Sequence, residues 1–180
     1  MADKPLVMAL ANPNPEIMPD EARKARPDAM ICTGRSDFPN QVNNVLCFPF
    51  IFRGALDVGA TAINEDMKHA AVAAIAQLAR DPPSDAIAPG FDSGEVQGFG
   101  PGSLIPSPFD PRLILRIAPA VATAALTSGV ASRPIASFEA YVAQLGPFAF
   151  RSGLVLTTGF AQAQHTRDKP ACRLLGRDWW

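Results

Sequence analysis

Short hydrophobic runs alternate with polar segments along the first 40 residues. Residues 5–11 (PLVMALA) stop at two Asn-Pro pairs, and residues 29–33 (AMICT) stop at the turn formers of residues 34–40 (GRSDFPN). Such runs predict buried strands. Between them, residues 19–26 (PDEARKAR) place Pro and acids before bases, which predicts an exposed helix. The order predicts a parallel pair with a crossover helix, so both strands end at one sheet edge.

Helical patterns follow in the middle of the chain. Residues 41–60 are apolar on most sides, which predicts one buried helix bent near Pro49. Apolar residues at three- and four-residue spacing then predict an amphipathic helix that Asn64 caps and that ends before Pro82. Residues 81–108 are rich in Pro, Gly and Ser, which predicts an irregular excursion rather than a packed element.

Two further helices are predicted towards the C-terminus. Asp110 is suited to cap the first of them, Pro111 to lie in its first turn and Gly129 to terminate it. Ser137 begins a shorter helix that extends to about Leu145. The whole pattern predicts an α/β fold: a partial Rossmann-type parallel sheet with flanking helices and an appended helical C-terminal segment.

Composition narrows the classes of partner. The chain has 180 residues and a formal net charge of -1, which gives no field to attract nucleic acid or an anionic membrane. Its apolar stretches are too short to span a membrane and its N-terminus lacks a secretory pattern, so we expect a cytoplasmic protein. Cys32, Cys47 and Cys172 are odd in number and widely spaced, which predicts reduced thiols. The two histidines, His69 and His165, lie far apart, which argues against a zinc site.

Three asparagines are the candidate ligand-binding residues. In an open parallel sheet, ligands bind beyond the carboxyl ends of the strands. Asn12 follows the first predicted strand, and its amide can donate and accept hydrogen bonds without adding charge. Asn43 and Asn44 are at the predicted start of the helix at 41–60, where free backbone N–H groups favour a carboxylate or phosphate. All three are also turn and cap formers, which is the role that local pattern alone favours, and composition does not decide between the two roles.

The other charged and nucleophilic residues favour structural roles. Arg35 and Asp37 are suited to an ion pair that shapes a turn, although Arg35 is also able to reach an anion. Arg53 and Asp57, four residues apart on one predicted helix, predict a partly buried salt bridge. Cys47 lies in an apolar run, which favours an unreactive thiol. No Gly-x-Gly-x-x-Gly follows a predicted strand. The sequence therefore offers neither a catalytic residue nor a metal ligand.

Three long stretches resemble bacterial malic enzymes. They are ALANPNPEI (residues 9–17), the segment from ICTGRSDFPNQVNN to MKHAAV (residues 31–72) and the segment from IPSPFDPRL to ASRPI (residues 105–135). The resemblance covers residues 4–162 and points to the later portion of the NAD(P)-binding domain. It is most similar to the large, NADP-preferring type, in which a phosphotransacetylase-like part follows the malic-enzyme part.

The resemblance implies an activity and residue roles. Malic enzymes decarboxylate malate oxidatively to pyruvate and carbon dioxide, using NADP or NAD and a divalent cation such as Mg2+ or Mn2+. By position, Asn12 is expected to contact the nicotinamide dinucleotide, and Asn44 with Asn43 to contact malate. The family's catalytic Tyr and Lys, its metal ligands and its Gly-rich loop precede the matched region. We therefore expect a fragment that is inactive alone and belongs to a homo-oligomer in its complete form.

The resemblance stops near the C-terminus. Residues 1–162 are expected to form the later part of the NAD(P)-binding domain with a helical extension. Residues 163–180 depart from the family pattern, so we expect an atypical tail, either frameshifted near Gln164 or disordered. NADP and NAD stay open, because the residues that read the ribose 2′ position precede this region.

Two other functions fit the same sequence. One is a noncatalytic remnant or interaction module that docks on an intact malic enzyme subunit through exposed apolar surface. The other is a different two-domain dehydrogenase.

Overall fold

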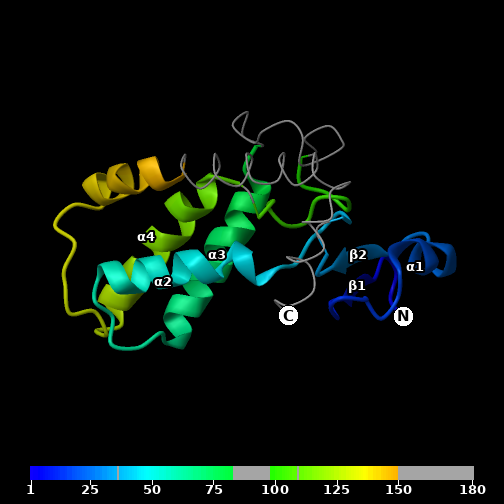
Figure 1. The fold of residues 1–180 in the computed structure, drawn as a ribbon, viewed down its shortest axis with the longest axis horizontal. Helices are drawn as coiled ribbons and strands as arrows, with labels where there is room; N and C mark the ends of the chain where they lie inside the picture. The colour runs from blue at the N-terminus through cyan, green and yellow to red at the C-terminus, as the bar shows by residue number, and fades with distance from the viewer. Residues whose placement is uncertain (36, 83–97, 109, 150–180) are drawn as a thin grey trace, which may run out of the picture.

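The molecule has a short sheet at one end and a group of helices at the other. The computed structural model describes residues 1–35, 37–82, 98–108 and 110–149. The elements in order are β1 (Leu6–Ala9), α1 (Pro19–Ala25), β2 (Met30–Thr33), η1 (Asn44–Leu46), α2 (Phe48–Asp57), α3 (Glu65–Arg80) and α4 (Arg112–Thr127), followed by a helical stretch at 138–149. The sheet and α1 lie at one end of an elongated molecule, and α2, α3 and α4 lie at the other (Figure 1).

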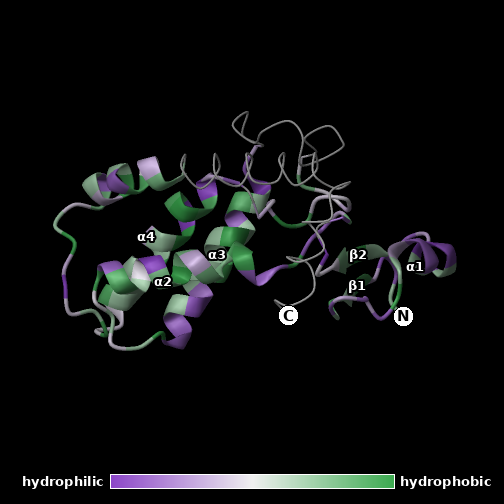
Figure 2. Cartoon of the chain, in the orientation of Figure 1, coloured by the Kyte–Doolittle hydropathy of each residue, from purple (hydrophilic) through white to green (hydrophobic). Residues whose placement is uncertain are grey.

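The predicted strand, helix and strand are confirmed. β1 and β2 pair in parallel, with Leu6 opposite Met30 and Ala9 opposite Thr33. Pro19 is in the first turn of α1, acids follow it and bases end the helix, as its dipole favours. Figure 2 shows that α1 is mostly hydrophilic, as expected of an exposed helix.

A third extended segment lies beside β2. Gln41 bridges Thr33 in the parallel sense, and the Val42 N–H donates to the Thr33 carbonyl oxygen over 2.8 Å. β2 is therefore central, with β1 on one side and the start of the 41–47 segment on the other. All three run in the same direction, so their carboxyl ends share one edge.

The prediction that β1 is buried is wrong for the described residues. Side chains alternate between the two faces of a strand. Leu6 is 50% exposed and Met8 is 51% exposed, whereas Ala9 is buried. α1 packs beside β2, and Ile31, Cys32 and Thr33 of that strand are buried. One side of β1 thus presents apolar side chains that no described element covers.

An Arg–Asp pair fixes the amino edge of the sheet. Arg26 donates from Nε and Nη2 to the two carboxylate oxygens of Asp28, both over 2.9 Å, and from Nη2 to the Ala2 carbonyl over 3.0 Å. The Lys4 N–H also donates to Asp28. These bonds hold the pKa of Asp28 well below its ordinary value, chiefly through the Arg26 guanidinium. The segments that enter β1 and β2 are thereby tied together.

The single bent helix predicted for residues 41–60 is wrong. The chain stays extended at Gln41 and Val42, makes the 3-10 turn η1, and begins α2 only at Phe48. Pro49 is in the first turn of α2, where its missing N–H leaves no intrahelical bond unmade. The proline therefore starts a helix instead of bending one.

The expectation that this helix is buried on all sides is also wrong. Phe48, Phe52 and Leu56, at four-residue spacing, are 62%, 42% and 64% exposed. The Phe48 and Phe52 rings contact each other, with centroids 4.8 Å apart. We refer to these three side chains as the α2 apolar stripe. It lies on the side of α2 turned away from the helical core.

Helices α2, α3 and α4 pack around a common core. α4 lies against both α2 and α3. The helix at 138–149 adds Tyr141 and Leu145 to the core. The largest fully buried apolar side chains in these helices and their connections are Val58, Met67, Leu78, Leu113, Ile117, Val121 and Leu145.

Helix ends follow the predicted caps. The Asn64 side chain accepts from the Met67 N–H and donates to Ser128 Oγ at the end of α4, over 2.8 Å. Gly129 has φ +74 and ends α4, as predicted for a C-terminal glycine. The predictions for Asn64 and Gly129 are confirmed. The start of α4 differs from the prediction, because Pro111 is its N-cap residue and the helix begins at Arg112, while the Asp110 side chain accepts from the Arg112 N–H just before it.

The last described helix starts where predicted and extends further. Ser137 Oγ accepts from the Ala140 N–H, and helical structure continues to residue 149, past the predicted end at Leu145. Tyr141 donates its hydroxyl hydrogen to Asp57 Oδ2 over 2.7 Å. Asp57 also accepts from Arg53 over 2.7 Å, which confirms the predicted salt bridge. Tyr141 thus joins this helix to α2.

One asparagine joins the sheet to a distant loop. The buried Asn40 side chain donates to the Ile31 and Pro101 carbonyls and accepts from the Leu104 N–H over 2.8 Å. Its backbone has φ +56, a conformation that asparagine tolerates better than most residues. Residues 98–108 lack regular structure, as predicted, but they are held against the core and are not a free excursion.

Helices α2 and α4 approach so closely at Gly54 that a side chain does not fit. A Cβ atom there would lie 2.5 Å from the Ala118 carbonyl oxygen and 2.9 Å from Val121 Cβ. Gly54→Ala should therefore lower the free energy of unfolding by about 2 kcal/mol through overpacking. Denaturant unfolding followed by circular dichroism measures this change.

Gly146 supplies the matched control. It lies in the helix at 138–149, and a Cβ there meets nothing within 4 Å. Gly146→Ala should raise stability by about 0.5 to 1 kcal/mol, because alanine loses less backbone entropy in a helix. Equal effects of the two substitutions would contradict a tight crossing at Gly54.

Candidate functional site

Asn12 lies at the carboxyl edge of the sheet against the loop that follows β2. A Cβ at Gly34 would lie 3.1 Å from Asn12 Nδ2 and 3.2 Å from Asn12 Oδ1. The bare Cα of Gly34 therefore lets the amide lie on this loop. Asn12 is exposed, and its side chain has no hydrogen-bond partner among the described residues. The amide is free to bind a ligand.

The loop that carries Asn12 is closed on itself. Glu16 accepts a hydrogen bond from the Ala11 N–H over 3.2 Å. Backbone N–H groups of Glu16 itself and of Ala11 lower the pKa of this carboxyl group below its ordinary value, so it stays ionised at neutral pH. Pro13 and Pro15 flank the tip of the loop, and proline fixes its own φ. Asn12 is thus carried by a short, constrained loop.

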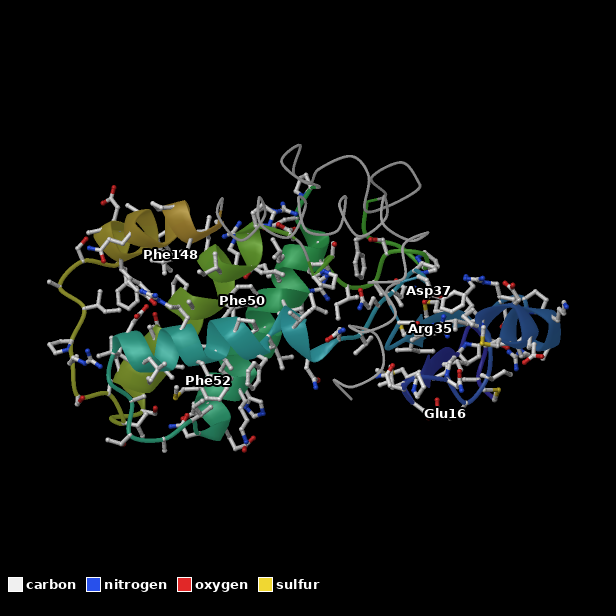
Figure 3. The ribbon with its side chains drawn as sticks, in the orientation of Figure 1. Glu16, Arg35, Asp37, Phe50, Phe52 and Phe148 are labelled. Atoms are coloured by element: carbon white, nitrogen blue, oxygen red, sulfur yellow. The ribbon has the colours of Figure 1, made fainter. Side chains whose placement is uncertain are left out.

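Arg35 connects the two loops at this edge. Its Nε and Nη2 donate to the two carboxylate oxygens of Asp37 over 2.8 and 2.6 Å, and its Nη1 donates to the Pro13 carbonyl over 3.4 Å. The guanidinium carbon also lies 5.4 Å from the centre of the Phe38 ring. Figure 3 shows Arg35 and Asp37 together between the sheet and the helices.

The ion pair predicted for Arg35 and Asp37 is confirmed. The Arg35 guanidinium lowers the pKa of Asp37, so both groups are charged at neutral pH. All three nitrogens of the guanidinium already donate hydrogen bonds within the described residues. These contacts favour the shaping of the loops over capture of an anion by Arg35.

Asn43 and Asn44 follow the third extended segment, but their surroundings differ from the prediction. They precede and begin the turn η1, not a long buried helix. Asn43 Oδ1 accepts from the Val45 N–H over 3.1 Å, so its carbonyl group caps this turn. Asn44 is exposed, and its side chain makes no hydrogen bond within the described part of the chain. One of the free N–H groups predicted here is therefore already occupied.

The arrangement of the three segments places these residues on one edge. Asn12 follows β1, and Asn43 and Asn44 follow Val42, with β2 between the two. Neighbouring strands are spaced by about 4.8 Å, so the outer segments are separated by about 10 Å. That spacing suits two adjacent ligand groups and leaves Gly34 and Arg35 between them.

Metal-binding groups do not gather at this edge. In the ranges that the structure describes, no three His, Cys, Asp or Glu side chains lie close enough to hold a metal ion. Cys32 and Cys47 are free, and burial raises the pKa of both thiols. The third cysteine, Cys172, lies outside the described residues.

Three further observations lie outside this edge of the sheet. A shallow groove between α3 and α4 is lined mainly by small side chains, together with Gln77 and Arg116. No helix within the described ranges is long and apolar enough to cross a membrane. The predicted tail at 163–180 also lies outside the described residues.

Two residues that shape the site were not singled out in the sequence. The sequence pattern places Gly34 in a turn and does not mark Glu16 for any role. The available signals are that Glu16 directly follows the two Asn-Pro pairs and that Gly34 directly follows a predicted strand. What the sequence does not give is the contact between the Asn12 amide and Gly34, which joins segments 22 residues apart.

The different roles of Asn43 and Asn44 are testable. Asn43→Ala removes the cap of η1 and should lower the free energy of unfolding by about 1 kcal/mol, whereas Asn43→Ser keeps an accepting oxygen and should retain most of it. Asn44→Ala should leave stability unchanged, since its side chain has no described partner. Chemical denaturation measures all three. A larger loss for Asn44→Ala than for Asn43→Ala would contradict these roles.

Known proteins match this chain over nearly all of its length. No protein-family model matches this sequence. The chain is 70% identical to an NAD-dependent malic enzyme of Rhizobium meliloti, over 99% of its own length and 23% of that protein's. It is 61% identical to an NADP-dependent malic enzyme of Salmonella typhimurium, over 91% of its own length and 22% of that protein's.

Solved structures of malic enzymes also match this chain. The fold matches the malic enzyme of Entamoeba histolytica with a TM-score of 0.68 and 32% identity, covering 94% of this chain and 31% of that one. It matches the malic enzyme of Pyrococcus horikoshii with a TM-score of 0.63 and 36% identity, covering 93% of this chain and 33% of that one. The chain thus spans less than a quarter of the curated relatives described above. Because 70% identity extends over nearly all of its residues, the chain belongs to the malic enzyme family and corresponds to a segment of its NAD(P)-binding fold.

Proposed function

We propose that this chain supplies part of the site at which a malic enzyme oxidatively decarboxylates malate to pyruvate and carbon dioxide while reducing NADP or NAD. The observation that carries the proposal is the unpartnered Asn12 amide, exposed at the same sheet edge as Asn44. Ligands of open parallel sheets bind at that edge. The relatives' names specify malic enzymes that depend on NAD or NADP.

Asn12 is the residue we assign to the cofactor. An uncharged amide is able both to donate to a carbonyl and to accept from an amide N–H, and the carboxamide of nicotinamide offers both groups. Gly34 leaves room for that amide on the neighbouring loop. The residues present therefore fit a nicotinamide group, which supplies the hydride acceptor when bound.

Asn44, with Asn43 beside it, is assigned to malate. The Asn44 side chain is exposed and unpartnered within the described ranges, so its amide nitrogen is able to donate to a carboxylate. Asn43 uses its oxygen to cap η1, which leaves its nitrogen free to donate. Both side chains orient substrate in this proposal. Neither transfers a proton.

The acid, base and metal ligands of the reaction are assigned to parts of the complete enzyme outside the described residues. Malic enzymes use Mg2+ or Mn2+, and such ions prefer carboxylate and other oxygen ligands. The described residues do not fit such an ion, since they hold no cluster of ligands for it. We accordingly expect this chain to be inactive alone.

Cofactor preference and cellular setting are also proposals. The relatives include an NAD-dependent enzyme at 70% identity and NADP-dependent enzymes at 61% and 60%, so NADP or NAD is the cofactor. We infer a homo-oligomer for the complete enzyme. A cytoplasmic location is supported by the free thiols of Cys32 and Cys47.

The α2 apolar stripe favours a second candidate function. Phe48, Phe52 and Leu56 are exposed together, and Leu6 and Met8 of β1 are exposed at the other end of the molecule. Apolar surface of this kind marks protein contacts. The chain would then dock on an intact malic enzyme subunit without taking part in catalysis.

Complementation tests the proposed function. The chain is mixed with the separately produced remainder of the Rhizobium meliloti relative, and reduction of NADP+ or NAD+ is followed with malate and Mn2+. The proposal expects activity only on mixing. It further expects Asn12→Ala to lower kcat/KM for the dinucleotide by about tenfold or more, the effect of losing an oriented hydrogen bond at the reacting group.

Asn14→Ala is the matched control. Asn14 lies in the same loop, is exposed, and directly precedes a proline, as Asn12 does. It should change kcat/KM by less than twofold. Equal losses for both substitutions would contradict the role of Asn12. An inactive mixture, together with stable binding of the chain to an intact relative, would instead support the interaction module.

A further inference from the structure

Two Arg-x-Asp pairs occupy equivalent places at opposite edges of the sheet. Arg26 and Asp28 precede β2, and Arg35 and Asp37 follow it. Each guanidinium binds its own aspartate through Nε and Nη2, and each also donates to a carbonyl in the flank of β1: that of Ala2 or that of Pro13. The two pairs thus share one chemistry but lie at different edges.

The two edges differ in what the pairs hold. Among the described residues, the side chains of the amino-edge pair make hydrogen bonds outside the pair only to the backbone that leads into β1. The carboxyl-edge pair holds Pro13, the residue next to Asn12, and Gly34, the neighbour of Arg35, lies directly against the Asn12 amide. A displacement of the carboxyl-edge pair would therefore move Asn12 in two ways, through Pro13 and through Gly34.

We propose that Arg35 and Gly34 are positioning residues that fix the Asn12 amide for the nicotinamide group. The inference rests on the proposed function of Asn12. Arg35 ties the Asn12 loop to the loop after β2, and Gly34 leaves room for the amide where a side chain would crowd it. Neither residue contacts the reacting atoms.

The geometry of Arg35 suits this role better than direct binding. A bidentate Arg–carboxylate pair has a fixed orientation, which a lysine does not reproduce. Asp37 accepts hydrogen bonds from Nε and Nη2 of Arg35, and the guanidinium lies over the Phe38 ring. These contacts fix the direction in which the third nitrogen, Nη1, points to Pro13. Gly34 does not have the left-handed backbone that would require glycine. The close approach of Asn12 is therefore the described constraint on a side chain at position 34.

Matched variants test the proposal. Arg35→Gln and Gly34→Ala change the carboxyl edge, whereas Arg26→Gln removes the equivalent pair at the amino edge. The first readout is the contact between the Asn12 side-chain amide and the Gly34 α-hydrogens, measured by NMR on the asparagine-labelled chain. The second readout is kcat and KM for the dinucleotide and for malate in the complemented enzyme. Thermal unfolding of each variant establishes that it is folded.

The expected results separate the two edges. Arg35→Gln should remove the Asn12–Gly34 contact, and Gly34→Ala should shift the Asn12 amide resonances. Both should lower kcat/KM for the dinucleotide about five- to twentyfold, since small displacements of a positioned group lower rates in this range. KM for malate should change by less than twofold. Arg26→Gln should leave the contact and the kinetics unchanged, even where it lowers the unfolding temperature.

Contrary results overturn the proposal in distinct ways. An intact Asn12–Gly34 contact in Arg35→Gln refutes positioning by Arg35, whatever the activity. Equal kinetic losses in Arg35→Gln and Arg26→Gln would show a general effect of sheet stability. If the unaltered mixture is inactive, the proposed function fails, but the NMR contact still decides whether Arg35 and Gly34 position Asn12.

Discussion

The parallel pairing of β2 with a segment on each side is the constraint on which the site depends. Thr33 is buried, lies opposite Ala9 on one side, and accepts from the Val42 N–H on the other. Three chain segments consequently leave the sheet at one edge. Those segments lead to Asn12, Gly34 and Asn43, so residues distant in sequence follow neighbouring segments of one sheet.

Hydrogen bonds to backbone groups connect this edge to the helical part of the molecule. Asn40 binds the Ile31 carbonyl of β2 together with Pro101 and Leu104, so it joins the sheet to the loop that precedes α4. α4 in turn packs against α2 so closely that position 54 has no room for a side chain. The carboxyl edge of the sheet is thus connected through Asn40 to the packed helices.

Much of the fold was predictable because local patterns determine it. Asn64, Gly129 and Ser137 act as the caps and terminator that their residue types favour. The prediction of one long helix over residues 41–60 is wrong at Pro49, because a proline fits the first turn of a helix as readily as a bend within one. The exposure of Leu6 and Phe48 was not predictable, because hydrophobicity alone does not show whether another element covers a side chain.

The candidate site was predictable in part. Strand exits and amide chemistry pointed to Asn12, Asn43 and Asn44, and the structure adds different surroundings for each. Capping by Asn43 and the contact of Asn12 with Gly34 depend on turn geometry and on long-range packing. Neither leaves a periodic signal in the sequence. The Arg35–Asp37 pair was predicted from its spacing, but its bond to Pro13 was not.

The central claim is that the carboxyl edge of the sheet receives the dinucleotide at Asn12 and malate at Asn44. The most direct measurement labels the asparagines of this chain with nitrogen-15, combines the chain with the unlabelled remainder of the relative, and follows the side-chain amide resonances during titration. The account predicts that NADP+ or NAD+ shifts Asn12 and that malate added afterwards shifts Asn44. Unchanged Asn12 and Asn44 resonances at saturating ligand, with catalysis present, would contradict it.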